Sequence, residues 1–366
     1  MKSPRNKIIT LQGEIYTLFS EVAVKLGVSE ETLSMMAISN FLNSSMVTSI
    51  IERSDEVFPP SIPNEASLSN QYFIASRTDF SWESIFADIK AEDIQFNNIN
   101  FQGIDLIDNE TILWGQFSRF LPIKVSLRML AAASQDLERG SYISVQEWFD
   151  YTFEHSVWDI REYLESVDLK YKNPRGEKLA SGFPRRGPKQ ELSLSRYVNH
   201  FCAEKQDMGI TGFPVQLGLI SVLPKTADES DVVDFDNWQI SFTKAGHDYI
   251  KMINPVIDEK DPTISMSDEE SNFMIDRIKT SLPASWGFFC FILTSIKKGS
   301  NNPTSLSNSI ESVFGKNSSR DWNEKQISTY RTGAIGLLGD LGLISRTWDF
   351  RSVTYDLTDK GENLVY

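Results

Sequence analysis

Two groups of basic and polar side chains have types and spacing suited to binding phosphate groups and flat polar rings. Residues 170–196 hold eight Lys and Arg residues against two Glu residues. The Gly and Pro residues between them predict an extended segment that stays off the core and becomes ordered on binding a polyanion. Residues 320–351 combine Arg and Lys with Gln, Ser and Thr. Arg and Gln form paired hydrogen bonds with planar groups, so both regions predict contact with a polyanion that carries such rings.

The elements that must position these side chains are predicted twice, in the same order, from apolar periodicity and turn residues. In the later copy we expect a helix over 285–298, a helix from Pro303 to Gly315, a helix over 323–341, and strands over 343–346 and 353–358. In the earlier copy we expect a helix over 125–137, a strand over 142–144, helices over 145–167 and 192–209, a ribbon from 217–221 to 238–246, and a trailing helix that ends before Pro255.

Each ribbon ends in a Thr that is followed three residues later by a Gly, at Thr243 and Gly246 and again at Thr358 and Gly361. Three helices followed by a short ribbon resemble the winged helix-turn-helix superfamily. The Thr-x-x-Gly signal is common by itself, so the resemblance rests on order and repetition. It implies a mainly α fold with small β-ribbons (α+β), containing two winged-helix domains.

In that superfamily the third helix enters the major groove of DNA, and phosphate contacts come from residues around it. In the later copy the resemblance therefore assigns base contacts to Gln326, Ser328, Thr329, Arg331 and Thr332, and backbone or minor-groove contacts to Arg320, Lys325, Arg346 and Arg351. In the earlier copy it assigns the basic insertion residues Arg175, Arg185, Arg186 and Lys189 and the third-helix residues Arg196, Tyr197, Asn199 and His200. His200 is equally consistent with a packed surface histidine.

The first fifty residues resemble a different family, the ribbon-helix-helix proteins. A short strand precedes a helix whose apolar face is followed by Gly27, and Ser29 begins the next helix. The resemblance implies a homodimer formed through residues 8–42. Outward positions on the strand would be Asn6, Ile8 and Thr10, where that family usually presents polar or basic side chains. Ile8 is neither polar nor basic, so the segment either reads bases despite this departure or serves for dimerisation only.

Four regions follow from these assignments. They are a ribbon-helix-helix-like segment over 1–50, a connecting region over 51–118, a first winged-helix domain over 119–262 with a basic insertion over 170–191, and a second winged-helix domain over 263–366. Three Pro residues between positions 59 and 63 place the first boundary, because Pro suits neither a helix interior nor a central strand.

The net charge of −14 does not favour nucleic-acid binding by itself, because DNA affinity depends on Lys and Arg. The acidic residues, however, are segregated from the basic ones. Residues 228–236 contain five acids, and residues 258–270 contain six acids and one Lys. We expect both acidic stretches to be solvated faces or linkers, which leaves a basic surface on an anionic protein.

Sequence motifs predict neither an enzyme nor a metal or cofactor site. Cys202 and Cys290 make no CxxC pair, the three His residues lack HxxxH spacing, and GxxxxGK[ST], GxGxxG and GxSxG motifs are absent. No apolar run reaches the ~18 residues of a membrane span, and no signal-peptide pattern follows Met1. We therefore expect a cytoplasmic, nucleoid-associated protein without membrane contact.

Together these features predict a sequence-dependent double-stranded DNA-binding protein, specifically a transcriptional regulator that acts as a homodimer. The alternative is a structural or adaptor winged-helix subunit of a chromosome-organising or anti-phage defence complex, with a protein partner. Charge reversal at Arg185 and Arg186 would distinguish them, since the regulator would lose DNA affinity and the adaptor would not.

Overall fold

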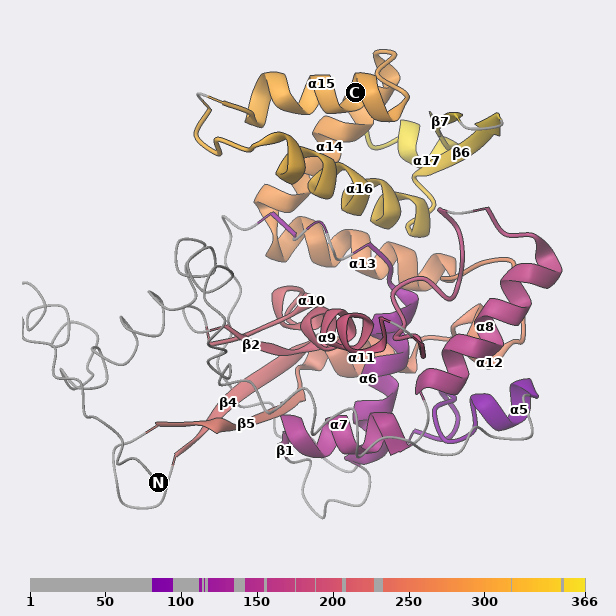
Figure 1. Ribbon diagram of the computed structural model, residues 1–366, viewed down its shortest axis with the longest axis vertical. Helices are drawn as coiled ribbons and strands as arrows, with labels where there is room; N and C mark the ends of the chain where they lie inside the picture. The colour runs from indigo at the N-terminus through magenta and orange to yellow at the C-terminus, as the bar shows by residue number, and fades with distance from the viewer. Residues whose placement is uncertain are drawn as a thin grey trace, which may run out of the picture. The chain divides into compact units, whose positions relative to one another are not determined.

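The computed structural model describes residues 81–94, 112–113, 115, 118–134, 142–154, 157–174, 176–187, 189–205, 209–226, 233–316, 318–349 and 352–365. The predicted ribbon-helix-helix segment and its dimer contact lie outside the described residues, as do Arg175 and Arg351. The chain divides into two compact units, and the larger comprises Glu65–Ala203 and Ile210–Tyr366 (Figure 1). Both predicted winged-helix domains lie in this larger unit, except for Glu204–Gly209, which belongs to the smaller one.

The described part of the chain is mainly helical and has small antiparallel strand pairs, so the predicted α+β class is confirmed at that level. We call residues 121–251 the first module and residues 283–362 the second module. Short helices α5 (Trp82–Ile85) and α12 (Pro255–Asp258) and the longer α13 (Asp268–Ser281) lie outside these ranges.

The first module begins with a buried helix and contains a three-stranded sheet of order β1-β5-β4. Its elements are α6 (Leu121–Ala133), β1 (Ile143–Ser144), α7 (Val145–Glu154), α8 (Val157–Tyr171), α9 (Gln190–Phe201), β2 (Ala203–Lys205), β3 (Gly209–Thr211), α10 (Phe213–Gln216), β4 (Ile220–Thr226), β5 (Val233–Phe242) and α11 (Lys244–Lys251). Two helix predictions were wrong here. The helix expected over 145–167 is divided into α7 and α8, and the one expected over 192–209 ends at Phe201, because apolar periodicity reports which face is buried but not whether the backbone is continuous.

The second module has the order predicted for it. Its elements are α14 (Pro283–Lys297), α15 (Pro303–Phe314), α16 (Glu324–Asp340), β6 (Ile344–Asp349), β7 (Ser352–Leu357) and α17 (Asp359–Glu362). Asn302 caps α15 and Asn323 caps α16, each with a reciprocal hydrogen bond from the third helical residue. Because these caps are local, the sequence located both helix starts within one residue.

Both third helices end in the same pentapeptide, Leu-Gly-Leu-Ile-Ser, at 217–221 and 341–345. The first Gly of each copy, Gly218 and Gly342, is in the left-handed region with φ of 60° and 68°. Such a residue ends a helix at little steric cost only when it is Gly. The following strand begins two residues later, at Ile220 and at Ile344.

The Thr-x-x-Gly turn closes on that pentapeptide in both modules. Thr243 Oγ1 donates to Gly218 O over 2.7 Å, and Thr358 Oγ1 donates to Gly342 O over 2.6 Å. The Gly three residues after each Thr is packed so closely that an added Cβ would lie 1.8 Å from Leu219 O or 2.0 Å from Leu343 O. The two modules therefore repeat a local structure as well as a sequence.

A second equivalence concerns the chain segment after each first helix. In the first module β1 follows α6 and pairs with β5, with Ile143 opposite Ile240. In the second module the segment after α14 makes a corresponding contact, since Tyr355 N on β7 donates to Asn301 O over 2.8 Å. In both modules, the last strand thus lies between the hairpin partner and the segment that follows the first helix.

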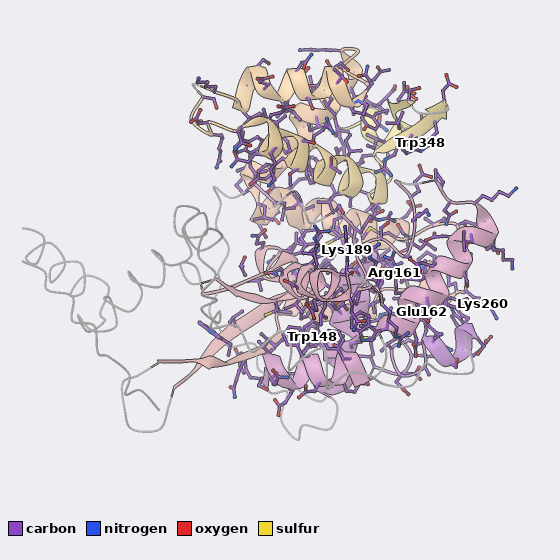
Figure 2. The ribbon with its side chains drawn as sticks, viewed as in Figure 1. Trp148, Arg161, Glu162, Lys189, Lys260 and Trp348 are labelled. Atoms are coloured by element: carbon purple, nitrogen blue, oxygen red, sulfur yellow. The ribbon has the colours of Figure 1, made fainter. Side chains whose placement is uncertain are left out.

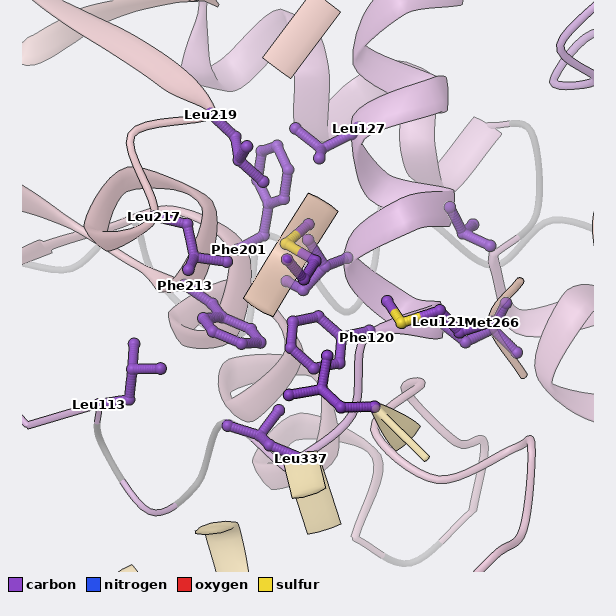
Figure 3. Close-up of a cluster of buried hydrophobic side chains, with 14 of the residues drawn as sticks. Leu113, Phe120, Leu121, Leu127, Phe201, Phe213, Leu217, Leu219, Met266 and Leu337 are labelled. Atoms are coloured by element: carbon purple, nitrogen blue, oxygen red, sulfur yellow. The ribbon is translucent and has the colours of Figure 1, made fainter. Parts of the chain in front are cut away.

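One hydrophobic core joins the two modules. The rings of Phe120 and Phe213 pack in a tilted arrangement with centroids 5.2 Å apart, and Leu337 of α16 belongs to the same buried cluster (Figure 3). Polar contacts cross the same junction, because Arg119 forms an ion pair of 3.1 Å with Asp340. The predicted domains over 119–262 and 263–366 therefore share a core within one compact unit.

Two buried ion pairs connect α6 to α12 and α13, and they correct the prediction that residues 258–270 form a solvated linker. Lys124 Nζ lies 2.8 Å from Glu270 Oε1, and both side chains have no exposed surface. Arg128 binds both carboxylate oxygens of Asp258 at 2.7 Å. Burial lowers the pKa of Lys124 to about 8, despite the opposite effect of Glu270. Acidic residues that look like linker in sequence are thus partners of buried cations.

Candidate nucleic-acid interface

One stripe along α9 points away from the core. Its residues are spaced three or four apart, which places them on one helical face. They are Lys189, which caps the helix, and Leu192, Arg196 and Asn199, all exposed. We call these four residues the α9 stripe. Figure 2 shows Lys189 at the start of this helix.

The cationic side chains of this stripe are not used for contacts within the described part of the structure. The Lys189 ammonium and the Arg196 guanidinium make no hydrogen bond or ion pair with any other residue that the structure describes. Arg185 lies beside them, because its backbone N–H donates to Ser193 Oγ on α9 over 3.0 Å, and its side chain is exposed. The structure thus brings together four predicted site residues: Arg185, Lys189, Arg196 and Asn199.

Two other residues predicted to face bases from this helix are buried instead. Tyr197 is 1% exposed and its hydroxyl lies 2.7 Å from Ser126 Oγ on α6. His200 stacks on Phe213, with ring centroids 5.6 Å apart, and burial lowers its pKa to about 3. The base contact expected for Tyr197 was wrong, and of the two alternatives for His200 the packed one holds, because both side chains lie on the face of α9 that packs on the core.

The basic insertion is packed against the first module, which corrects the prediction that it stays off the core. Leu179 and Phe183 are 3% exposed. The buried carboxylate of Asp168 accepts the backbone N–H groups of Leu179 and Ala180 at 2.9 and 3.1 Å, and Arg161 donates to the Ala180 carbonyl. A segment that looked extended from its Gly and Pro content is therefore held by backbone hydrogen bonds to charged side chains.

Arg186 is engaged in ion pairs and does not belong with the available cations. Its guanidinium lies 2.9 Å from Asp159 Oδ1 and 2.6 Å from Glu162 Oε1, both on α8. Asp159 is nearly fully buried. Replacing Arg186 by Glu would place three carboxylates together, so the charge-reversal test at Arg185 and Arg186 would disturb folding as well as binding.

The start of α16 uses several of its predicted base-reading residues for structure. Gln326 Oε1 accepts the Asn323 N–H at 2.9 Å in the helix cap. The Arg331 guanidinium donates to the Pro303 carbonyl over 2.8 Å and to Ser307 Oγ, both on α15. Thr329 Oγ1 donates to a carbonyl of its own helix. Among the predicted residues on this helix, Lys325, Ser328 and Thr332 are exposed.

The outward face of α16 is exposed to solvent over its first two turns, and beyond them it is covered by another segment of the chain. Lys325, Ser328 and Thr332 are exposed. One turn further on, a Cβ added at Gly336 would lie 2.4 Å from Ser118 O, and one added at Gly333 would lie 2.5 Å from Gly115 O. Gly115 and Ser118, which we call the crossing segment, thus lie directly against this part of the helix. Sequence reasoning missed this contact.

The predicted wing residue Arg346 also has a structural role. Its guanidinium donates to Gly176 O and to Ile335 O, each over 2.6 Å. Burial and the neighbouring Arg119 lower its pKa. This correction has a geometric reason, since Arg346 lies near the base of the hairpin and not at its tip. Arg320 is exposed near the start of α16.

Other kinds of site find little support in the described residues. Across that part of the chain, no group of three or more His, Cys, Asp and Glu residues could hold a metal ion. In the same residues, each helix is too short or too polar to cross a lipid bilayer. Comparison of the chain with models of protein families, with curated proteins and with solved structures finds no match.

Proposed function

We propose that this chain binds double-stranded DNA through the first module, with the α9 stripe in the major groove, and that it acts as a dimeric transcriptional regulator. The observation that carries the proposal is the clustering of Arg185, Lys189 and Arg196 on one surface, without acidic partners among the described residues. A protein with a net charge of −14 needs such a local concentration of cations to attract phosphates.

The repeated topology supports a winged-helix assignment for both modules. Each has a first helix, a segment that pairs with the last strand, a third helix that ends in a left-handed Gly, and an antiparallel hairpin. In winged-helix proteins this arrangement presents the third helix to the major groove. The dimer contact through residues 8–42 remains part of the proposal and rests on sequence resemblance.

A mobility-shift experiment with random duplexes at about 50 mM salt tests DNA binding, because screening of phosphate contacts is weak there. We expect retardation that weakens steeply with added salt, and a selected pool that contains a recurring motif. A twofold-symmetric motif would support the dimer. If the pure protein retards no duplex under these conditions, the proposed function is wrong.

Charge reversal locates the surface. Lys189→Glu with Arg196→Glu is expected to lower affinity by about 100-fold, since two phosphate contacts become repulsive. The matched control is Lys251→Glu with Lys298→Glu, which changes net charge equally at exposed positions at the ends of α11 and α14. Equal losses in the two double variants would show that net charge, and not the α9 stripe, governs binding.

The adaptor alternative is favoured by one specific feature of the second module. Its third helix is partly covered by the crossing segment, and Arg331 is bound to α15. A helix covered in this way suits protein contact better than entry into a groove. Lys325→Glu distinguishes the roles: if the second module docks on protein, duplex affinity stays within about threefold of wild type, whereas groove contact would give a larger loss.

A further inference from the structure

The α9 stripe contains one apolar side chain among polar ones. Leu192 is 49% exposed, with Lys189 one turn before it and Arg196 one turn after it. The three side chains lie on one face because their spacing of three and four residues follows the helical repeat. Exposed apolar surface at the centre of a cationic stripe gains free energy when a ligand covers it.

The surrounding charges decide which ligand fits. A purely apolar protein surface placed on Leu192 would also cover two cations without supplying counter-charges, which is costly. The DNA major groove supplies phosphates along its edges and, on its floor, one apolar group that side chains can reach: the C5 methyl of thymine. Lys189 and Arg196 lie one helical turn before and after Leu192 on the same face, where they can reach phosphates while Leu192 faces the groove floor.

We propose that Leu192 packs on the C5 methyl group of a thymine and thereby determines part of the sequence preference. This inference rests on the proposed function, since it specifies what the α9 stripe reads. It adds a residue whose role is selection of a base, whereas Arg185, Lys189 and Arg196 contribute affinity for any sequence.

The test removes the methyl group without changing base pairing. Duplexes recovered by selection are resynthesised with deoxyuridine in place of one thymine at a time, and affinities are measured for wild type and for Leu192→Ala. Wild type is expected to lose about fourfold at one position, which is the value of one buried methyl group. Leu192→Ala is expected to bind both duplexes equally well.

Leu169→Ala is the matched control, because Leu169 on α8 is 75% exposed and lies off the α9 stripe. This variant should keep the wild-type preference for thymine over deoxyuridine. Urea unfolding of both variants checks that each keeps the wild-type fold.

The possible outcomes distinguish failure of the thymine contact from failure of the proposed DNA binding. A wild-type protein that binds duplexes but tolerates deoxyuridine at every position would overturn the thymine contact and leave DNA binding intact. A Leu192→Ala protein that keeps the thymine preference would assign that preference to another residue and would also overturn the contact. A wild-type protein that retards no duplex would remove both proposals.

Discussion

The third helices of the two modules end alike but differ along their length. α16 is continuous over Glu324–Asp340, whereas the third helix of the first module is divided into α9 and α10 by the β2–β3 hairpin. The break is tightly closed, since a Cβ added at Gly212 would lie 2.0 Å from Phe201 O. The shared Leu-Gly-Leu-Ile-Ser ending is thus compatible with a helix that contains an insertion.

The cations near these helices differ in what they contact. Lys189 and Arg196 on α9 project from the surface, whereas Arg331 on α16 binds α15 and Arg346 on the adjoining hairpin binds Gly176. A basic residue at a predicted binding position is therefore available for a ligand only when nearby carbonyl and carboxylate oxygens do not already bind its side chain. This distinction assigns DNA contact to the first module in our proposal.

The largest effect is expected where α6 of the first module packs on α13. Lys124→Met should lower the free energy of unfolding by about 3–5 kcal/mol, because Glu270 would stay buried without its partner. Lys124 Nζ also donates to Tyr249 O and Met252 O, so its three protons are all used. Urea unfolding followed by tryptophan fluorescence measures the change.

Two further variants show whether the loss of stability in Lys124→Met comes from the unpaired charge of Glu270. Adding Glu270→Gln to Lys124→Met should restore part of the stability, since no unpaired charge remains. The exposed Lys251→Met should change stability by no more than about 0.5 kcal/mol. Two separate unfolding transitions in wild type would show that the modules are independent and that the junction matters less than its burial implies.

A smaller effect is expected from placing a methyl group between the crossing segment and α16. Gly336→Ala should destabilise by about 1–3 kcal/mol, because the backbone at Ser118 must move. Gly287→Ala in α14 is the control, since its Cβ would meet no atom within 4 Å and Ala favours a helix by up to about 1 kcal/mol. Equal stability of wild type and Gly336→Ala would argue against a close crossing. Thermal or urea unfolding reports both changes.

The smallest effect concerns the histidine beside the break in the third helix. Burial lowers the pKa of His200 to about 3, below its ordinary value of 6.5, so the unfolded chain binds its proton first on acidification. Stability from this group is present above pH 6.5 and is lost as the pH falls toward 3. Between pH 6.5 and 5 wild type should lose about 1.5 kcal/mol more than His200→Gln. Parallel stability curves over this range would contradict the burial of a neutral imidazole.

The second module shows how far sequence reasoning reaches. Its three long helices were located to within about two residues and its strands to within about three, and Asn302, Asn323 and Gly315 are local end signals for the helices. The first module was less predictable, since an aromatic-rich pattern runs through two helices and an inserted hairpin interrupts the third. Of its predicted site residues, Arg185, Lys189, Arg196 and Asn199 are exposed together, while Tyr197 and His200 are buried.

The sequence by itself determined where the three long helices of the second module begin and end, the repeated Leu-Gly-Leu-Ile-Ser and Thr-x-x-Gly turns, and the mainly helical α+β class. These features depend on caps, left-handed glycines and periodicity, all of which act between residues close in the chain. The tertiary structure decided which charges remain at the surface. Arg128 binds Asp258, 130 positions away, and contacts at such separation leave no local signal.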